Sequence, residues 1–142
     1  PHAGSPDRGG LNLLIHKALA GEKLTIYGAG DYLRDYIFVD DVVEAFLLAA
    51  LHIDSVNGVC FVIGTGHGTR LKDAIRLIAE RVMLKTTKEV LVEHVGPSVG
   101  QSPIDCRHFV ADPGRFCKAT NWKCHWSLSQ GIDSTVEAIQ EK

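Results

Sequence analysis

One stretch of the chain, YGAGDYLRDYIFVDD at residues 27–41, carries most of the side chains whose chemistry can be interpreted. Arg34 stands between a glycine turn and an apolar run, and two aspartates follow that run directly. A guanidinium stays charged at physiological pH and can present two parallel N–H donors to a carboxylate or a phosphate. From these residues alone Arg34 has two interpretations: an anion-binding side chain, or a surface arginine paired with Asp31 or Asp35.

A second glycine-rich stretch, VIGTGHGTRL, places Gly64, Gly66 and Gly68 between an expected strand and an expected helix. Backbone amides at such a junction can bind phosphate. The spacing departs from the dinucleotide-binding fingerprint, which has a further glycine where Thr69 stands, and the lysine and hydroxyl of a P-loop are absent. We therefore interpret the stretch as a structural turn that needs positive φ, and we expect no cofactor site in this chain.

The cysteines point to reduced thiols, because the four of them show no Cys-x-x-Cys spacing and are few for a disulfide scaffold in 142 residues. Cys117, Cys124 and His125 lie close together in sequence, but no second ligand pair at matching spacing completes a zinc site. We expect no bound metal.

Composition limits the possible partners. The chain has 45% hydrophobic residues and a formal net charge of −2, which predicts one domain over residues 1–142 and gives no electrostatic basis for binding nucleic acid or an anionic membrane. No apolar run reaches the roughly 18 residues of a membrane span, and the first ten residues lack the order of a signal peptide. The expected setting is cytoplasmic.

The hydrophobic periodicity predicts alternating helices and strands, which is typical of the α/β class. Strands are expected at 24–27, 36–39, 59–63 and 89–95, and helices at 11–19, 42–51 and about 70–83. Asp41 with Glu44 predicts a capping box for the second helix, which is apolar around most of its circumference. Asp112 with Pro113 predicts the start of a short helix ending near residue 119, and Ser127 with Gln130 predicts the capping box of the last helix.

Three segments together resemble the NAD-dependent nucleotide-sugar epimerase/dehydratase family, the extended short-chain dehydrogenases. They are LTIYGAG followed after three residues by RDYIFVDD, then FVIGTGHGTRLKDAIRLIAE, then ADPGRFCKATNWKCHWSLSQGIDSTVEAI. The resemblance covers nearly the whole chain but only the C-terminal part of the family's usual length. It implies a small mixed α/β substrate-binding subdomain that lacks the Rossmann half, with a nucleotide sugar as partner.

The resemblance also assigns candidate substrate-binding residues. Arg34 matches the family's arginine that pairs with the diphosphate, and Tyr27 with Gly28 matches the segment near the base. Asp105 stands where the family has an aspartate that reaches the ribose, although the preceding Arg-x-Gly is absent and Arg107 is a partial substitute. Asn12 falls where the family lines the sugar-nucleotide cleft, a position that an amphipathic helix start explains equally well.

The machinery of catalysis is not found in this sequence. The family uses NAD or NADP and a Tyr-x-x-x-Lys pair, and the residues four positions after the three tyrosines are Asp31, Tyr36 and Asp40. Two hypotheses follow: the substrate-binding portion of an epimerase or dehydratase that is incompetent alone, or a stand-alone binding or assembly module. The sequence fixes neither the sugar, the base nor the reaction. Because the cofactor half is absent, we expect the apolar helix at 42–51 either to meet that half or to make the chain a homo-oligomer, in particular a dimer.

Overall fold

The computed structural model describes residues 10–96 and 107–141, and it contains helices around two small sheets. In chain order the elements are α1 Gly10–Leu19, β1 Leu24–Tyr27, β2 Leu33–Arg34, α2 Val39–Leu51, α3 Ile53–Val56, β3 Thr69–Arg70, α4 Leu71–Thr86, β4 Val92–Val95, α5 Gly114–Thr120 and α6 Leu128–Gln140. None of the helices in these ranges is long and apolar enough to cross a membrane. The predicted mixed α/β class is confirmed.

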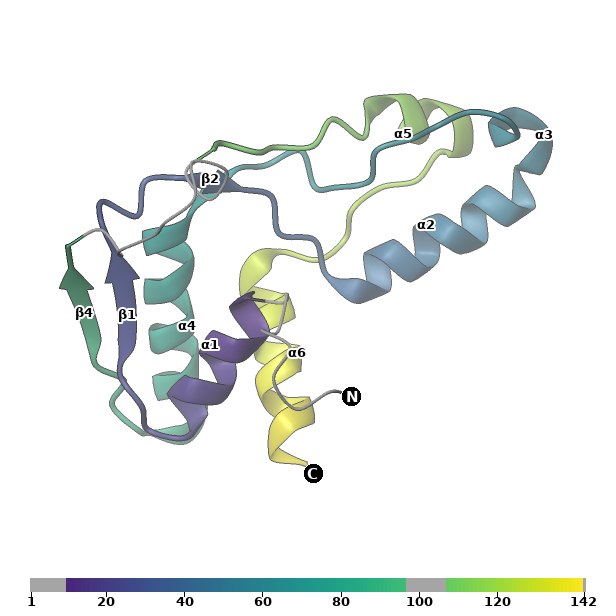
Figure 1. Cartoon of the computed structure of the whole chain (residues 1–142). Coiled ribbons are helices and arrows are strands. Elements are labelled where there is room, and N and C mark those ends of the chain that lie inside the picture. The colour runs from purple at the N-terminus through teal and green to yellow at the C-terminus, as the bar shows by residue number, and fades with distance from the viewer. Residues whose placement is uncertain (1–9, 97–106, 142) are drawn as a thin grey trace, which may run out of the picture.

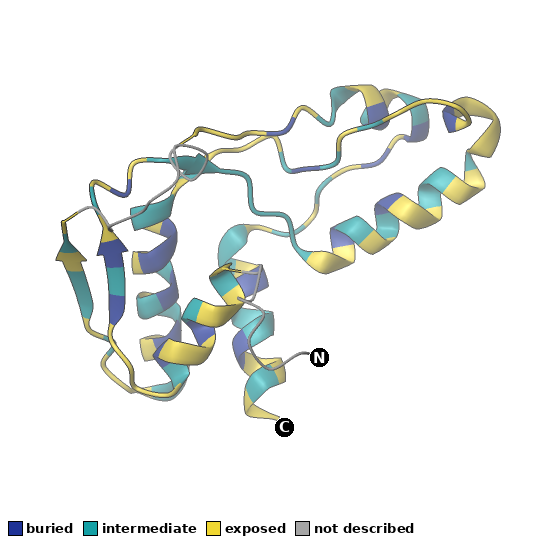
Figure 2. Cartoon of the chain, viewed as in Figure 1, coloured by how far each residue is buried: buried dark blue, intermediate teal, exposed yellow. Residues whose placement is uncertain are grey.

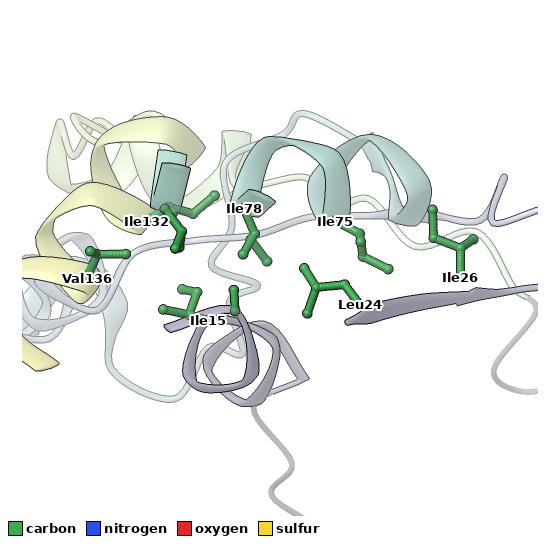
Figure 3. Close-up of a cluster of buried hydrophobic side chains, with 9 residues drawn as sticks. Ile15, Leu24, Ile26, Ile75, Ile78, Ile132 and Val136 are labelled. Carbon is green, nitrogen blue, oxygen red and sulfur yellow. The ribbon is translucent and has the colours of Figure 1, made fainter. Parts of the chain in front are cut away.

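The larger apolar core joins α1, α4 and α6 to the parallel pair β1 and β4, where Leu24 lies opposite Val92 (Figures 1 and 3). Its buried members come from one face of each helix, as the periodicity predicted, and from β1: Ile15, Ala18, Leu24, Ile26, Ile75, Ile78, Val82, Ile132 and Val136. Two ion pairs, Arg81 with Asp133 and Lys85 with Glu137, repeat at four-residue spacing along α4 and α6. The bond from Arg81 is the main cause that lowers the pKa of Asp133.

A second, smaller core lies at the other end of the molecule, where α2, α3 and α5 come together (Figure 1). It consists of Ala45, Val56, Phe116 and Trp122, with partly buried side chains that include Ile37, Phe61 and Ile63. The face of α2 away from this core is exposed along most of its length (Figure 2).

Two of the predicted strands are wrong. Residues 36–38 and 59–63 lie outside any strand, and Val39 is the first residue of α2. The apolar pattern correctly indicated burial, since Ile37, Phe61 and Ile63 pack against the second core. A strand also needs a neighbouring ladder, and among the described residues these segments have none. The strand expected at 89–95 is limited to the four residues that pair with β1.

The ends of the helices confirm some of the capping residues predicted from the sequence and contradict others. The Ser127 and Gln130 capping box is present, and Gly21 follows α1 with φ +76°. Asp112 accepts the amide of Gly114 at 2.9 Å, so it caps the first turn of α5 from one position further upstream, with Pro113 as the N-cap. The predicted Asp41 cap of α2 is wrong, because Phe38 is the N-cap and makes no side-chain bond.

Candidate anion-binding site

Arg34 lies on a short strand that is held from both sides. On one side β2 pairs antiparallel with β3, with Leu33 opposite Arg70. On the other side Phe109 donates its amide to the Leu33 carbonyl at 3.0 Å, and the Leu33 amide donates to Nδ1 of His108 at 3.1 Å. The Arg34 guanidinium donates to the carbonyls of Leu33, at 3.0 Å, and Arg107. The structure therefore brings the predicted Arg34 and Arg107 together, through the backbone of Arg107.

Positive charge dominates the surroundings of this strand. Asp31 pairs with Nζ of Lys72 at 2.5 Å and lies 3.9 Å from Nε of Arg70. The bond from Lys72 is the main cause that lowers the pKa of Asp31, and the nearby charges of Arg70 and His108 act in the same direction. Lys72, Arg70 and His108 lie near the Asp31 carboxylate, Arg34 lies on β2, and Arg107 belongs to the segment that contacts Arg34. We call these five residues the basic cluster. Such a set can attract a phosphate group.

The other predicted residues lie at the end of β1, at the start of α1 or outside the described ranges. Tyr27 and Gly28 end β1, where Gly28 has φ +63° and donates its amide to Val95 at 3.0 Å. Asn12 is exposed at the start of α1 and lines a cavity of about 90 Å³ with Tyr36. Burial raises the pKa of Tyr36, and the positive charge of Arg34 opposes that shift. Asp105 lies outside the described residues.

The glycine turn already binds a carboxylate of this chain. Asp35 accepts the amides of Thr65 and Gly66, both at 3.0 Å, the Thr65 hydroxyl at 2.5 Å and the amide of Ala111 at 3.1 Å. A side chain at Gly64 would not fit, because its Cβ would lie 2.3 Å from Cβ of Ala111 and 2.8 Å from Oδ2 of Asp35. Gly66 has φ +75°, as the interpretation of a structural turn requires. This role of Asp35 was not predicted from the sequence, in which the only signal for it is the position of Asp35 beside Arg34.

Asp41, predicted as a helix cap, fixes a distant segment instead. Its buried carboxylate accepts the amides of His125 at 2.9 Å and Trp126 at 3.1 Å, and the thiol of Cys124 at 3.0 Å. Its carbonyl accepts Nε1 of Trp122 at 3.1 Å. Burial, together with the bond to Asp41, raises the pKa of the Cys124 thiol to about 11. The thiol is therefore protonated at neutral pH.

The two carboxylates shape a groove between the segments that they hold. The groove has a volume of about 650 Å³ and lies between the glycine turn and residues 121–128. Its lining includes His67, Lys123 and Trp126. Within the described ranges, no three His, Cys, Asp or Glu side chains form a group that could hold a metal ion.

Known proteins resemble this chain in both sequence and fold. The sequence profile of the NAD dependent epimerase/dehydratase family matches residues 1–64. The UDP-glucose 4-epimerase of Mycolicibacterium smegmatis is 31% identical over 142 residues, which are 100% of this chain and 41% of that protein. The dTDP-glucose 4,6-dehydratase 1 of Escherichia coli is 29% identical over 127 residues, which cover 89% of this chain and 35% of that protein.

Solved structures agree with these relatives. The UDP-glucose 4-epimerase of Thermotoga maritima, solved with UDP-glucose, has a TM-score of 0.75 and 31% identity over 96% of this chain and 40% of that one. An epimerase of Methanothermobacter thermautotrophicus has a TM-score of 0.78 at 17% identity, which shows a shared fold. The family predicted from the motifs is confirmed: the chain belongs to the NAD dependent epimerase/dehydratase family. It spans about two fifths of the length of these relatives.

Proposed function

We propose that this chain binds the nucleoside diphosphate of a nucleotide sugar, as the substrate-binding portion of an epimerase or dehydratase. The observation that carries the proposal is the basic cluster around β2, where the Arg34 guanidinium is hydrogen-bonded to two backbone carbonyls. A guanidinium held in this way loses less conformational entropy when it binds a phosphate group. The relative from Thermotoga maritima was solved with UDP-glucose, a ligand of this chemical class.

We expect Arg34→Ala to weaken the binding of UDP or dTDP, whichever binds more tightly, by about 10- to 100-fold. The reason is the loss of a charge-assisted bond to the diphosphate, and isothermal titration calorimetry measures the effect. Arg76→Ala is the matched control, because it removes the same charge from an exposed position on α4. Equal affinities of the Arg34→Ala and wild-type chains would remove the basis for the proposal.

We also propose that the chain alone does not transfer hydride, and we expect it to bind neither NAD nor NADP at micromolar concentration. The sequence lacks the dinucleotide fingerprint and the Tyr-x-x-x-Lys pair. The turn amides of Thr65 and Gly66 are bonded to Asp35, so they are occupied. Fluorescence titration with NADH and NADPH tests this expectation. Micromolar binding that disappears in Gly66→Trp would contradict it.

A further inference from the structure

Asp35 connects the strand of Arg34 to two segments that are distant in sequence. Its oxygens take four hydrogen bonds, and the amide donors come from residues 30, 31 and 76 positions away. One of these donors, the Ala111 amide, belongs to the segment 107–111 that also contacts Arg34 through the Arg107 carbonyl. Asp35 therefore fixes the position of the segment that holds the guanidinium.

Hydrogen bonds join residues 33–35 to residues 107–111 on both sides of Arg34 in the sequence. Phe109 binds the Leu33 carbonyl, Arg34 binds the Arg107 carbonyl, and Asp35 binds the Ala111 amide. Alternate residues of one segment thus contact three consecutive residues of the other. Gly64 lets Ala111 and Asp35 approach one another, because any Cβ there would clash with both.

We propose that Asp35 is the positioning residue for Arg34, an inference that rests on the proposed function. A carboxylate beside a basic cluster opposes the binding of an anion through its charge. If Asp35 acted only through its charge, its neutralisation would strengthen nucleotide binding. If it positions Arg34, the same change weakens binding, because an amide at this place turns an NH₂ group toward N–H donors that need an acceptor. The two mechanisms predict opposite signs.

The decisive variant is Asp35→Asn, titrated calorimetrically with UDP and dTDP beside Arg34→Ala and the double variant. We expect Asp35→Asn to lose about tenfold in affinity or more, and to have no further effect once Arg34 is removed, since coupled residues are not additive. Asp41→Asn is the control, because it disturbs the buried carboxylate of Asp41, which holds a different segment. Tighter binding by Asp35→Asn, or additive losses in the double variant, would overturn the proposal.

Amide hydrogen exchange tests the hydrogen bonds between residues 33–35 and 107–111 in the absence of ligand. We expect Asp35→Asn to speed exchange at Phe109, whose amide binds Leu33 and makes no contact with Asp35 itself. Unchanged exchange at Phe109 would overturn the positioning role, whether or not a nucleotide binds. A wild-type chain that binds no nucleotide would instead refute the proposed function. Thr65→Val is the milder variant if Asp35→Asn fails to fold, because it keeps the three amide bonds to Asp35 and removes the hydroxyl bond to Asp35 together with the hydroxyl bonds to His67. It should weaken binding by about 2- to 10-fold, and unchanged or tighter binding would contradict the proposal.

Discussion

Replacement of Asp41 by alanine should lower the free energy of unfolding by about 3 kcal/mol, because three donors lose their acceptor together. These donors are the amides of His125 and Trp126 and the thiol of Cys124. The Asp41 side chain is buried, and water reaches the vacated place poorly. Urea unfolding followed by circular dichroism measures the change, and it should shift the midpoint while leaving the slope unchanged.

Asp40→Ala provides the matched control for this prediction. Asp40 is the neighbouring aspartate in the same first turn of α2, but it is exposed. Its loss should cost about 0.5 kcal/mol, which corresponds to a weakened interaction with the helix dipole. If Asp41→Ala and Asp40→Ala destabilise the chain equally, then the bonds to residues 124–126 contribute nothing to stability.

The second large effect that we expect is self-association through α2. Phe46 and Leu47 are 74% and 61% exposed, and Val39, Val43 and Leu51 on the same helix are also exposed. The sequence predicted a helix that is apolar around most of its circumference, and its face away from the second core is exposed in the structure (Figure 2). A continuous apolar surface of this kind is uncommon on a soluble monomer. We therefore predict a dimer at micromolar concentration, formed either through this face or by exchange of a terminal element such as α1.

Light scattering coupled to size-exclusion chromatography tests this prediction. Phe46→Asp should convert the dimer to a monomer, because a carboxylate in an apolar interface loses its hydration. Leu84→Asp is the control, since Leu84 is 60% exposed on α4, away from the α2 face. A wild-type chain that stays monomeric would contradict the prediction. A dimer that survives Phe46→Asp would show that the α2 face is not the interface.

Local sequence patterns predicted the elements whose structure depends on near neighbours. Helices α1, α4 and α6 follow the 3.6-residue spacing of their apolar side chains, and Ser127 with Gln130 completes its capping box three residues away. Gly21, which follows α1 with positive φ, also acts locally, whereas β1 was predicted from its composition but forms through its pairing with β4. The family, and with it the interest in Arg34, came from the order of motifs along the chain.

Contacts between distant residues decided the rest. The runs at 36–39 and 59–63 have the composition of strands, but a strand exists only where a neighbouring backbone supplies hydrogen bonds, and composition does not report that neighbour. Asp41 satisfies the spacing of a helix cap, but its oxygens bind donors 83 to 85 residues away. The Asp35 carboxylate likewise accepts amides from distant residues, in the glycine turn and at Ala111. The sequence by itself determined the family, the helices α1, α2, α4, α5 and α6, and the candidate arginine, but not the short helix α3. The hydrogen-bond partners of the Asp35 and Asp41 carboxylates depended on which donors the folded chain brought within hydrogen-bonding distance.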